Sequence, residues 1–222
     1  MVDVAEKIAL CVERGKVDRT SPYPPDMKDQ DGTDEITAAA LQAGLKPAVI
    51  LDGCMLGMER IGRKFGENKV FVPELLMAAR AMTAAMKHLQ PYLESGEVKH
   101  RGRFVIGTVS GDLHDIGKNL VSMTIKGYGF EVIDLGVDVP TDKFLQAIAD
   151  HPGCFVGLSA LLTTTMAGME KSVRAIKEQF PDTKVLVGGA PVNPQFCAQI
   201  GADFYAPDPQ GAAAYLSQSV SP

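Results

Sequence analysis

The second half of the chain alternates short apolar runs with helix-like segments, and this alternation constrains the fold more than any other feature. The first run is Phe104–Val109, and a helical pattern over Gly117–Tyr128 follows it. Further strands are expected at 131–135, 154–158, 184–187 and 203–205, and further helices at 141–149, 166–180, 194–200 and 210–217. Continuous apolar runs of this length are typical of buried parallel strands. The pattern predicts an α/β domain with a doubly wound, five-stranded parallel sheet of the flavodoxin or Rossmann-like type.

The first half of the chain has a helical period instead. Helices are expected over Val4–Glu13, Thr33–Ala43, Pro47–Lys64 and Pro73–Leu89. Thr33 is a plausible N-cap, and the two prolines suit the first turn of a helix. Four helices predict a small antiparallel bundle.

Polar segments separate these parts. Residues 19–31 contain three prolines and several acids, so a loop is expected there. Residues 91–102 are polar and are expected to link a helical domain, residues 1–95, to the α/β domain, residues 96–222.

Composition excludes several classes of function. The net charge of −5 and the single basic cluster Lys99–Arg103 give little support for binding nucleic acid. No apolar run reaches the length of a membrane span, and the charged start of the chain is unlike a secretory signal. The four cysteines form no C-x-x-C pair, so reduced thiols in a cytoplasmic protein are expected.

Three short motifs stand at fixed distances in the second half. Residues 112–117 read Asp-Leu-His-Asp-Ile-Gly, and forty-one residues separate Gly117 from Ser159-Ala160-Leu161. Twenty-six more residues separate Leu161 from the pair Gly188-Gly189. The motifs follow the first, third and fourth expected strands, which are neighbours in the order 2-1-3-4-5. Ligands bind at the switch point of such sheets, so the three motifs are expected to form one crevice.

The residue types in this crevice suggest a metal or a cofactor. Neutral imidazole binds a metal through one ring nitrogen, and Asp112 can accept a hydrogen bond from the other nitrogen of His114. Ser159 offers a hydroxyl group, whereas Gly117 and Gly188-Gly189 leave room for a flat ligand. A phosphate loop at Gly111–Lys118 is rejected because its spacing is wrong and Asn119 stands where Ser or Thr is needed. A zinc site would need further ligands that the sequence lacks at suitable spacing.

The D-x-H-x-x-G, S-x-L and G-G series resembles the signature of cobalamin-binding domains. The resemblance implies that His114 is an axial ligand of cobalt and that the dimethylbenzimidazole tail of the cofactor enters the slot beside the glycines. In methionine synthase-like members, a serine six residues after that of S-x-L completes an Asp-His-hydroxyl relay, and here Thr165 has that position. The implied cofactor-binding residues are Asp112, His114, Asp115, Gly117, Ser159, Leu161, Thr163, Thr165, Gly188 and Gly189.

The segment Phe65–Met82 resembles the helical cap of methionine synthase and of methyl-transferring corrinoid proteins. The resemblance implies that Phe65, Val72, Leu75 and Leu76 cover the upper face of cobalt. Their helical spacing also suits an ordinary bundle core. Residues 19–31 depart from the family pattern and look like an insertion between the first two cap helices.

The resemblance therefore implies a corrinoid methyl carrier that cycles between cobalt(I) and methyl-cobalt(III). Its methyl donor would be an aromatic methyl ether, which we slightly prefer, or methanol, a methylamine or betaine. The acceptor would be tetrahydrofolate or a thiol. Implied partners are a substrate:corrinoid methyltransferase, a second methyltransferase for the acceptor and a reductive activator.

Three alternatives stay open. The small subunit of an adenosylcobalamin mutase would carry the same motif, although such subunits commonly lack this cap. A cobalamin sensor that controls transcription would need a DNA-binding segment, which the acidic chain does not show. The third is a ligand-free flavodoxin-like interaction domain.

Overall fold

The computed structural model describes residues 4–220. The outer ends of the two expected domains, residues 1–3 and 221–222, lie outside the described residues. Backbone contacts divide the chain into two compact units. The first contains the chain up to His100 together with Lys126–Gly129, and the second contains Arg101–Ile125 and the chain from Phe130 onward.

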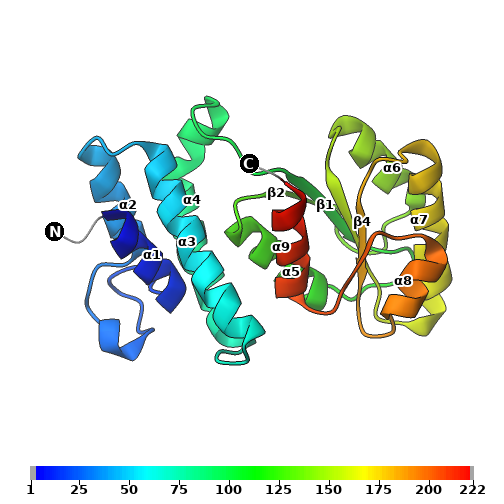
Figure 1. The fold of residues 1–222 in the computed structure, drawn as a ribbon, viewed down its shortest axis with the longest axis horizontal. Coiled ribbons are helices and arrows are strands. Elements are labelled where there is room, and N and C mark those ends of the chain that lie inside the picture. The colour runs from blue at the N-terminus through cyan, green and yellow to red at the C-terminus, as the bar shows by residue number, and fades with distance from the viewer. Residues whose placement is uncertain (1–3, 221–222) are drawn as a thin grey trace. The chain divides into compact units, whose positions relative to one another are not determined.

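The first unit consists mainly of helices (Figure 1). These are α1 (Val4–Arg14), the 3-10 turn η1 (Pro25–Met27), α2 (Thr33–Gln42), α3 (Pro47–Gly66) and α4 (Val72–Glu94). Helix α1 packs against α3 and α4, and α2 packs against α4. Glycines let α1 and α3 approach closely, since a β-carbon at Gly57 would lie 2.5 Å from the carbonyl oxygen of Ala9. Ile8, Val12, Ile50, Met82 and Leu89 are fully buried in this unit.

The structure corrects two predictions in this unit. The N-cap of α2 is Gly32, not Thr33, because the hydroxyl of Thr33 donates to the carbonyl oxygen of Lys16 at 2.9 Å. Helix α4 continues through Pro91 to Glu94, so the expected linker starts too early. Only the last turn follows Pro91, and the N–H of Ser95 closes that turn by donating to the carbonyl oxygen of Pro91 at 3.0 Å.

The second unit is a five-stranded, entirely parallel sheet in the order β2-β1-β3-β4-β5, which confirms the predicted fold class. Its strands are β1 (Arg103–Thr108), β2 (Glu131–Asp134), β3 (Phe155–Ser159), β4 (Val185–Gly188) and β5 (Phe204–Ala206). Its helices are α5 (Ile116–Gly127), α6 (Thr141–Asp150), η2 (Thr163–Thr165), α7 (Met166–Gln179), α8 (Pro194–Ile200) and α9 (Pro209–Ser219).

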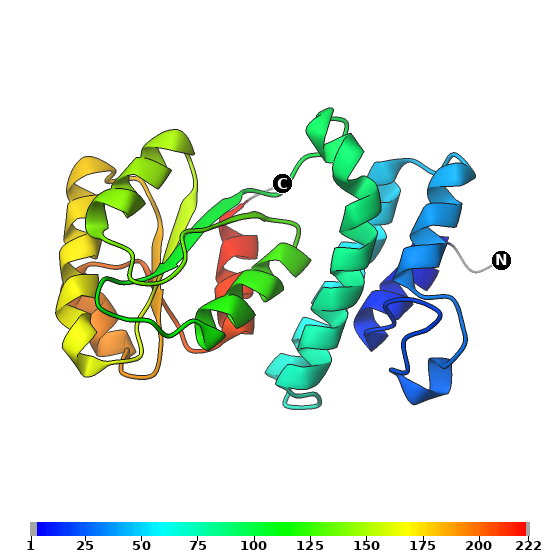
Figure 2. The same cartoon turned by 180° about the vertical axis from the view of Figure 1, so that it is seen from behind.

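Helices cover both faces of this sheet. Figures 1 and 2 show α5 and α9 on one face and α6, α7 and α8 on the other. The face under α6 to α8 carries a continuous apolar core, in which Val105, Val156 and Val185 pack with Phe144 and Ile176. The register brings Thr108 beside Ser159 and Ser159 beside Gly188, so the carboxyl ends of β1, β3 and β4 lie together.

Asp203 links β4 to helix α7 through hydrogen bonds. Its carboxylate accepts hydrogen bonds from Lys177 Nζ at 2.5 Å, from the N–H of Val185 at 2.8 Å and from Lys184 Nζ at 3.1 Å. Burial by itself raises the pKa of Asp203, but these donors outweigh it and hold the pKa below its usual range. The ionised carboxylate therefore stabilises the folded state.

We predict that Asp203→Asn lowers the free energy of unfolding at neutral pH by about 1–3 kcal/mol, because the buried N–H of Val185 and the partly buried Lys177 lose their charged acceptor. The difference in free energy of unfolding between the wild type and Asp203→Asn should be complete above the pKa of an unfolded aspartate, about 3.9. It should shrink as the pH falls below that value toward the lower folded pKa. Urea titrations of both cofactor-free proteins between pH 7 and about pH 3 measure this difference in stability, since Asp titrates in that range.

Asp182→Asn is the matched control, because Asp182 is exposed. If both variants lost the same stability at every pH, the pairing of Asp203 would not be the cause.

Candidate functional site

The three sequence motifs meet at the carboxyl edge of the sheet, as predicted. Asp112 and His114 lie in the loop between β1 and α5, and Leu161 lies in the loop that follows β3. The N–H of Leu161 donates to Asp112 Oδ2 at 2.7 Å, which joins the two loops directly.

Asp112 is the centre of this arrangement. Its side chain is fully buried. Oδ1 accepts from the ring Nδ1 of His114 at 2.7 Å and from the N–H of His114 at 3.1 Å. Oδ2 accepts from the N–H of Leu161 at 2.7 Å, from the N–H of Leu162 at 3.2 Å and from Thr165 Oγ1 at 3.0 Å. Burial alone raises the pKa of Asp112, but these donors prevail and hold the pKa well below its ordinary value.

His114 is left with one free ring nitrogen. An ionised carboxylate only accepts hydrogen bonds, so Nδ1 of His114 is the donor, and in neutral imidazole the lone pair then lies on Nε2. Within residues 4–220, Nε2 has no hydrogen-bond partner, and the side chain is 51% exposed. The main chain is also held, because Thr108 Oγ1 donates to the carbonyl oxygen of His114 at 2.8 Å. The arrangement presents an oriented imidazole, and its neutral form is suited to bind a metal through Nε2.

Thr165 supplies the hydroxyl group of the expected Asp-His-hydroxyl relay. Its hydroxyl lies 3.0 Å from Asp112 Oδ2 and 2.8 Å from the carbonyl oxygen of Leu162, so one proton serves two acceptors. The extra methyl group is accommodated beside Gly111, since a β-carbon there would lie 3.6 Å from Thr165 Cγ2. Threonine therefore keeps the contact that a serine would make.

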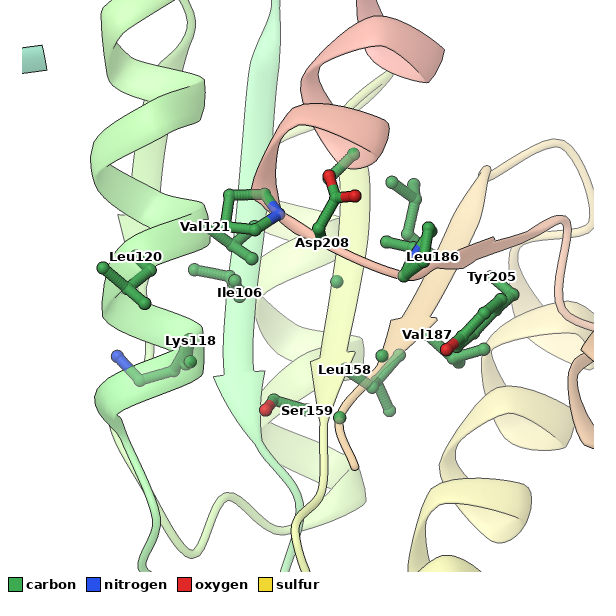
Figure 3. A pocket seen from close by; sticks show the side chains of 18 of the residues that line it. Ile106, Lys118, Leu120, Val121, Leu158, Ser159, Leu186, Val187, Tyr205 and Asp208 are labelled. Atoms are coloured by element: carbon green, nitrogen blue, oxygen red, sulfur yellow. The ribbon is translucent and has the colours of Figure 1, made fainter. Parts of the chain in front are cut away.

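A cavity of about 270 Å³ lies on the sheet face that α5 and α9 cover. Its lining includes Gly117, Leu120, Val121, Ser159, Gly188 and Ala212. Figure 3 shows Ser159 at the carboxyl end of β3 and the amino group of Lys118 pointing away from Ser159 and β3. That amino group pairs with Asp134 Oδ2 at 2.5 Å. The cavity is consequently mainly apolar, with Ser159 supplying a hydroxyl near its mouth.

The predicted glycines have different roles. A β-carbon at Gly117 would meet no atom within 4 Å, and one at Gly188 would come closest to the carbonyl oxygen of Ala206, at 3.0 Å. Gly117 therefore keeps space open, whereas Gly188 lets β4 pack closely against Ala206 of β5. Gly189 has φ of 120°, and a β-carbon there would lie 1.8 Å from the carbonyl oxygen of Ala160. The backbone itself requires glycine at this position.

Other predicted residues lie at the edge of the site. Asp115 is exposed, and its Oδ2 accepts from Asn119 Nδ2 at 2.9 Å. Leu161 contributes its N–H to Asp112, whereas its side chain is 43% exposed. Thr163 begins η2 and is exposed, so the structure does not bring its side chain to Asp112.

The four predicted cap residues lie in the first unit. Phe65 is in the last turn of α3, and Val72, Leu75 and Leu76 are in the first turns of α4. Leu75 is buried, and the other three are partly buried. The connection between the two helices also carries Phe71, which is 69% exposed and was not predicted.

Sequence reasoning missed three other residues near Asp112 and His114. Thr108 ends β1, Lys118 is buried in α5 and Asp138 contacts the loop that contains Asp112. The sequence pointed only to Lys118, a charged residue directly after the first motif. Within residues 4–220, no cluster of three or more His, Cys, Asp or Glu side chains could hold a metal ion, and no helix is long and apolar enough to cross a membrane.

Two family models match the chain. The model described as "B12 binding domain" matches residues 102–214. A second model with the same description matches residues 28–90. The predicted cobalamin cofactor is thereby confirmed.

Curated relatives are similar over most of their length. The trimethylamine corrinoid protein of Methanosarcina barkeri is 36% identical over 198 residues, covering 87% of this chain and 91% of the relative. The dimethylamine corrinoid protein 1 of Methanosarcina mazei is 41% identical over 187 residues, covering 82% of this chain and 87% of the relative.

Solved structures give the same result. The methanol:cobalamin methyltransferase complex MtaBC from Methanosarcina barkeri matches with a TM-score of 0.80 and 28% identity, covering 98% of this chain and 79% of that chain. A cobalamin-binding protein from Desulfitobacterium hafniense matches with a TM-score of 0.76 and 27% identity over the whole of both chains. With a B12 binding domain over half of its length and corrinoid proteins as relatives, the chain belongs to the family of B12-binding corrinoid proteins.

Proposed function

We propose that this protein is the corrinoid methyl carrier of a multi-component methyltransferase system. The observation that carries the proposal is the buried Asp112, which fixes an exposed imidazole with a free Nε2 beside an apolar cavity. When bound, a corrinoid supplies a cobalt centre that takes up a methyl group from one substrate and releases it to another. The relatives are named for trimethylamine and dimethylamine, and the structural neighbour for methanol. These names support a methylamine or methanol as the methyl donor more than an aromatic methyl ether.

The residues present fit such a cofactor. Nε2 of His114 would bind the cobalt, while Asp112 keeps the ring oriented and its other nitrogen protonated. Gly117 would leave the cavity open for the nucleotide tail, Gly188 adds no side chain to its lining, and Ser159 would offer a hydrogen bond.

Apolar side chains near His114 suit the flat ring of a corrinoid. Leu113 is 72% exposed, Ile116 is 78% exposed, and Leu161 and Leu162 are 43% and 41% exposed. Leu113, Leu161 and Leu162 stand on the two loops that meet at Asp112, and Ile116 begins α5 directly after the first of these loops. Leucine and isoleucine side chains at such exposure favour an apolar ligand, because grouped apolar surface usually marks a binding site.

We further propose that residues 1–95 form a cap domain and residues 96–222 the corrinoid-binding domain. Phe65, Val72, Leu75 and Leu76 would shield a bound cofactor from water. The support is that the second B12 binding domain model includes these residues.

The proposed partners are a substrate:corrinoid methyltransferase, a methyltransferase that serves tetrahydrofolate or a thiol, and a reductive activator. The first is supported by the structural neighbour, which is a methyltransferase complex. We also propose a cytoplasmic location, supported by four cysteines that are all free and buried.

The alternatives receive less support. A mutase subunit and a cobalamin sensor would share the motif around His114. The relatives are corrinoid proteins named for methylamines, and the helical half of the chain has its own B12 binding match, which together favour the carrier.

We predict that His114→Ala retains bound methylcobalamin, because the cavity still holds the nucleotide tail, but loses the visible spectrum of an imidazole-bound corrinoid. Absorbance of the purified, loaded protein is the measurement. His151→Ala is the control, since His151 begins the connection from α6 to β3, away from the motif loops. A loaded His114→Ala protein with the wild-type spectrum would show that His114 is not a ligand.

Gly117→Leu tests the cavity. The new side chain enters open space on a helix, so the fold should be retained while methylcobalamin affinity falls on the order of 100-fold, since a blocked tail forfeits several kcal/mol of contacts. Equilibrium dialysis gives the affinity, and circular dichroism checks the fold. Gly66→Leu, on the open side of α3, is the matched control. Unchanged affinity in the Gly117 variant would place the tail elsewhere.

Asp112→Asn tests the central carboxylate in the cofactor-free protein. The variant replaces one carboxylate oxygen with an NH2 group, which cannot accept a hydrogen bond. Donors buried around that position, from the main chain or from Thr165, then lose their acceptor. The free energy of unfolding should fall by about 1–3 kcal/mol. Asp115→Asn makes the same chemical change on the exposed side of the loop and should leave stability almost unchanged. Equal urea midpoints for the two variants would contradict the role assigned to Asp112.

A further inference from the structure

The connection between β2 and α6 runs beside the loop that carries His114. The N–H of Val139 donates to the carbonyl oxygen of Thr108 at 2.9 Å, and Val109 and Val139 form an isolated parallel bridge. The pairing of β1 with the chain after β2 therefore continues beyond the ends of both strands. This places the connection where it can support the turn before Asp112.

Asp138 makes that support specific. Its Oδ1 accepts from the N–H of Gly111 at 2.7 Å and from Ser110 Oγ at 3.3 Å. Its own N–H donates to the carbonyl oxygen of Asp112 at 2.9 Å. The backbone of Asp138 has φ of 51°, a left-handed conformation that aspartate tolerates better than most residues. The conformation brings the side chain and the N–H of one residue to the same turn.

The turn over Ser110–Asp112, which Asp138 restrains, determines where the Asp112 carboxylate points. Gly111 has φ of 83°, and the N–H of Asp112 donates to the carbonyl oxygen of Val109 at 3.1 Å, so the chain reverses just before Asp112. A charged acceptor on the N–H of Gly111 is a strong and directional restraint on that reversal. The Asp112 carboxylate in turn sets the orientation of the His114 ring at 2.7 Å.

We propose that Asp138 is a positioning residue for His114, acting by holding the Ser110–Asp112 turn. Asp138 does not contact the imidazole. It restrains the main chain on which the Asp112 carboxylate stands, and so favours the ring orientation that leaves Nε2 free for cobalt. The inference rests on the proposed role of His114 as a ligand.

Three variants of the full chain separate the possible causes. Asp138→Gly removes the acceptor but keeps the left-handed backbone accessible. Asp138→Asn keeps an acceptor oxygen at the same position. Asp29→Gly is the matched control, because Asp29 is also an exposed aspartate with positive φ, 61°, but lies in the first unit.

Each protein is loaded with methylcobalamin, and its visible spectrum gives the ratio of imidazole-bound to imidazole-free cofactor. His114→Ala supplies the imidazole-free reference. Asp138→Gly should lower this ratio on the order of tenfold, the effect of losing one hydrogen bond to a charged group. Asp138→Asn should restore most of the ratio, and Asp29→Gly should match the wild type. A wild-type ratio in Asp138→Gly, or an equal loss in Asp138→Asn, would overturn the inference.

A cofactor-free measurement decides the remaining cases. Amide NMR signals of Gly111 and His114 should shift in Asp138→Gly and return toward wild type in Asp138→Asn. If Asp138→Gly binds no methylcobalamin, unchanged His114 signals in the cofactor-free protein would overturn the inference. If the wild type itself shows no imidazole-bound spectrum, the proposed ligand role of His114 fails, and the NMR comparison still tests whether Asp138 holds the turn.

Discussion

The carboxylate of Asp112 is the interaction on which the site depends. A fully buried charge is costly unless every oxygen lone pair finds a donor, and here the donors come from two different loops and a ring. The same hydrogen bonds therefore serve stability and function. Movement of the loop after β3 would remove the N–H of Leu161 and the hydroxyl of Thr165, and would leave a buried carboxylate to hold His114 alone.

The two faces of the sheet explain why a cavity forms on one of them. On the face under α6 to α8, branched side chains such as Val105, Val156 and Val185 fill the space between sheet and helices. On the face under α5 and α9, Gly157 and Gly188 take strand positions where a valine would stand. The ring of Phe104 lies over Gly157, since a β-carbon there would approach it to 2.4 Å. Beyond that ring the small residues leave the slot open, because nothing else replaces the missing side-chain volume.

The sequence predicted what depends on pattern and missed what depends on contacts. The strand order and the meeting of the three motifs follow from alternation and from the switch-point rule, and both were correct. The N-cap at Thr33 was wrong because its hydroxyl bonds to Lys16, seventeen positions earlier, a contact that no local pattern encodes. The hydrogen bonds of Asp138 were equally hidden, since they need β2 to lie beside β1 and a left-handed backbone at an ordinary aspartate.

The exposed apolar side chains beside His114 follow from the same constraint as the buried carboxylate. The backbones of Leu161 and Leu162 are fixed because both N–H groups bind Asp112, and Leu113 is fixed between Asp112 and His114. These side chains therefore cannot turn into the core without breaking hydrogen bonds to a buried charge. A loop that must hold an imidazole in place thus also holds an apolar surface next to it. The two properties together suit a flat ligand that has a metal at its centre and apolar surface around it.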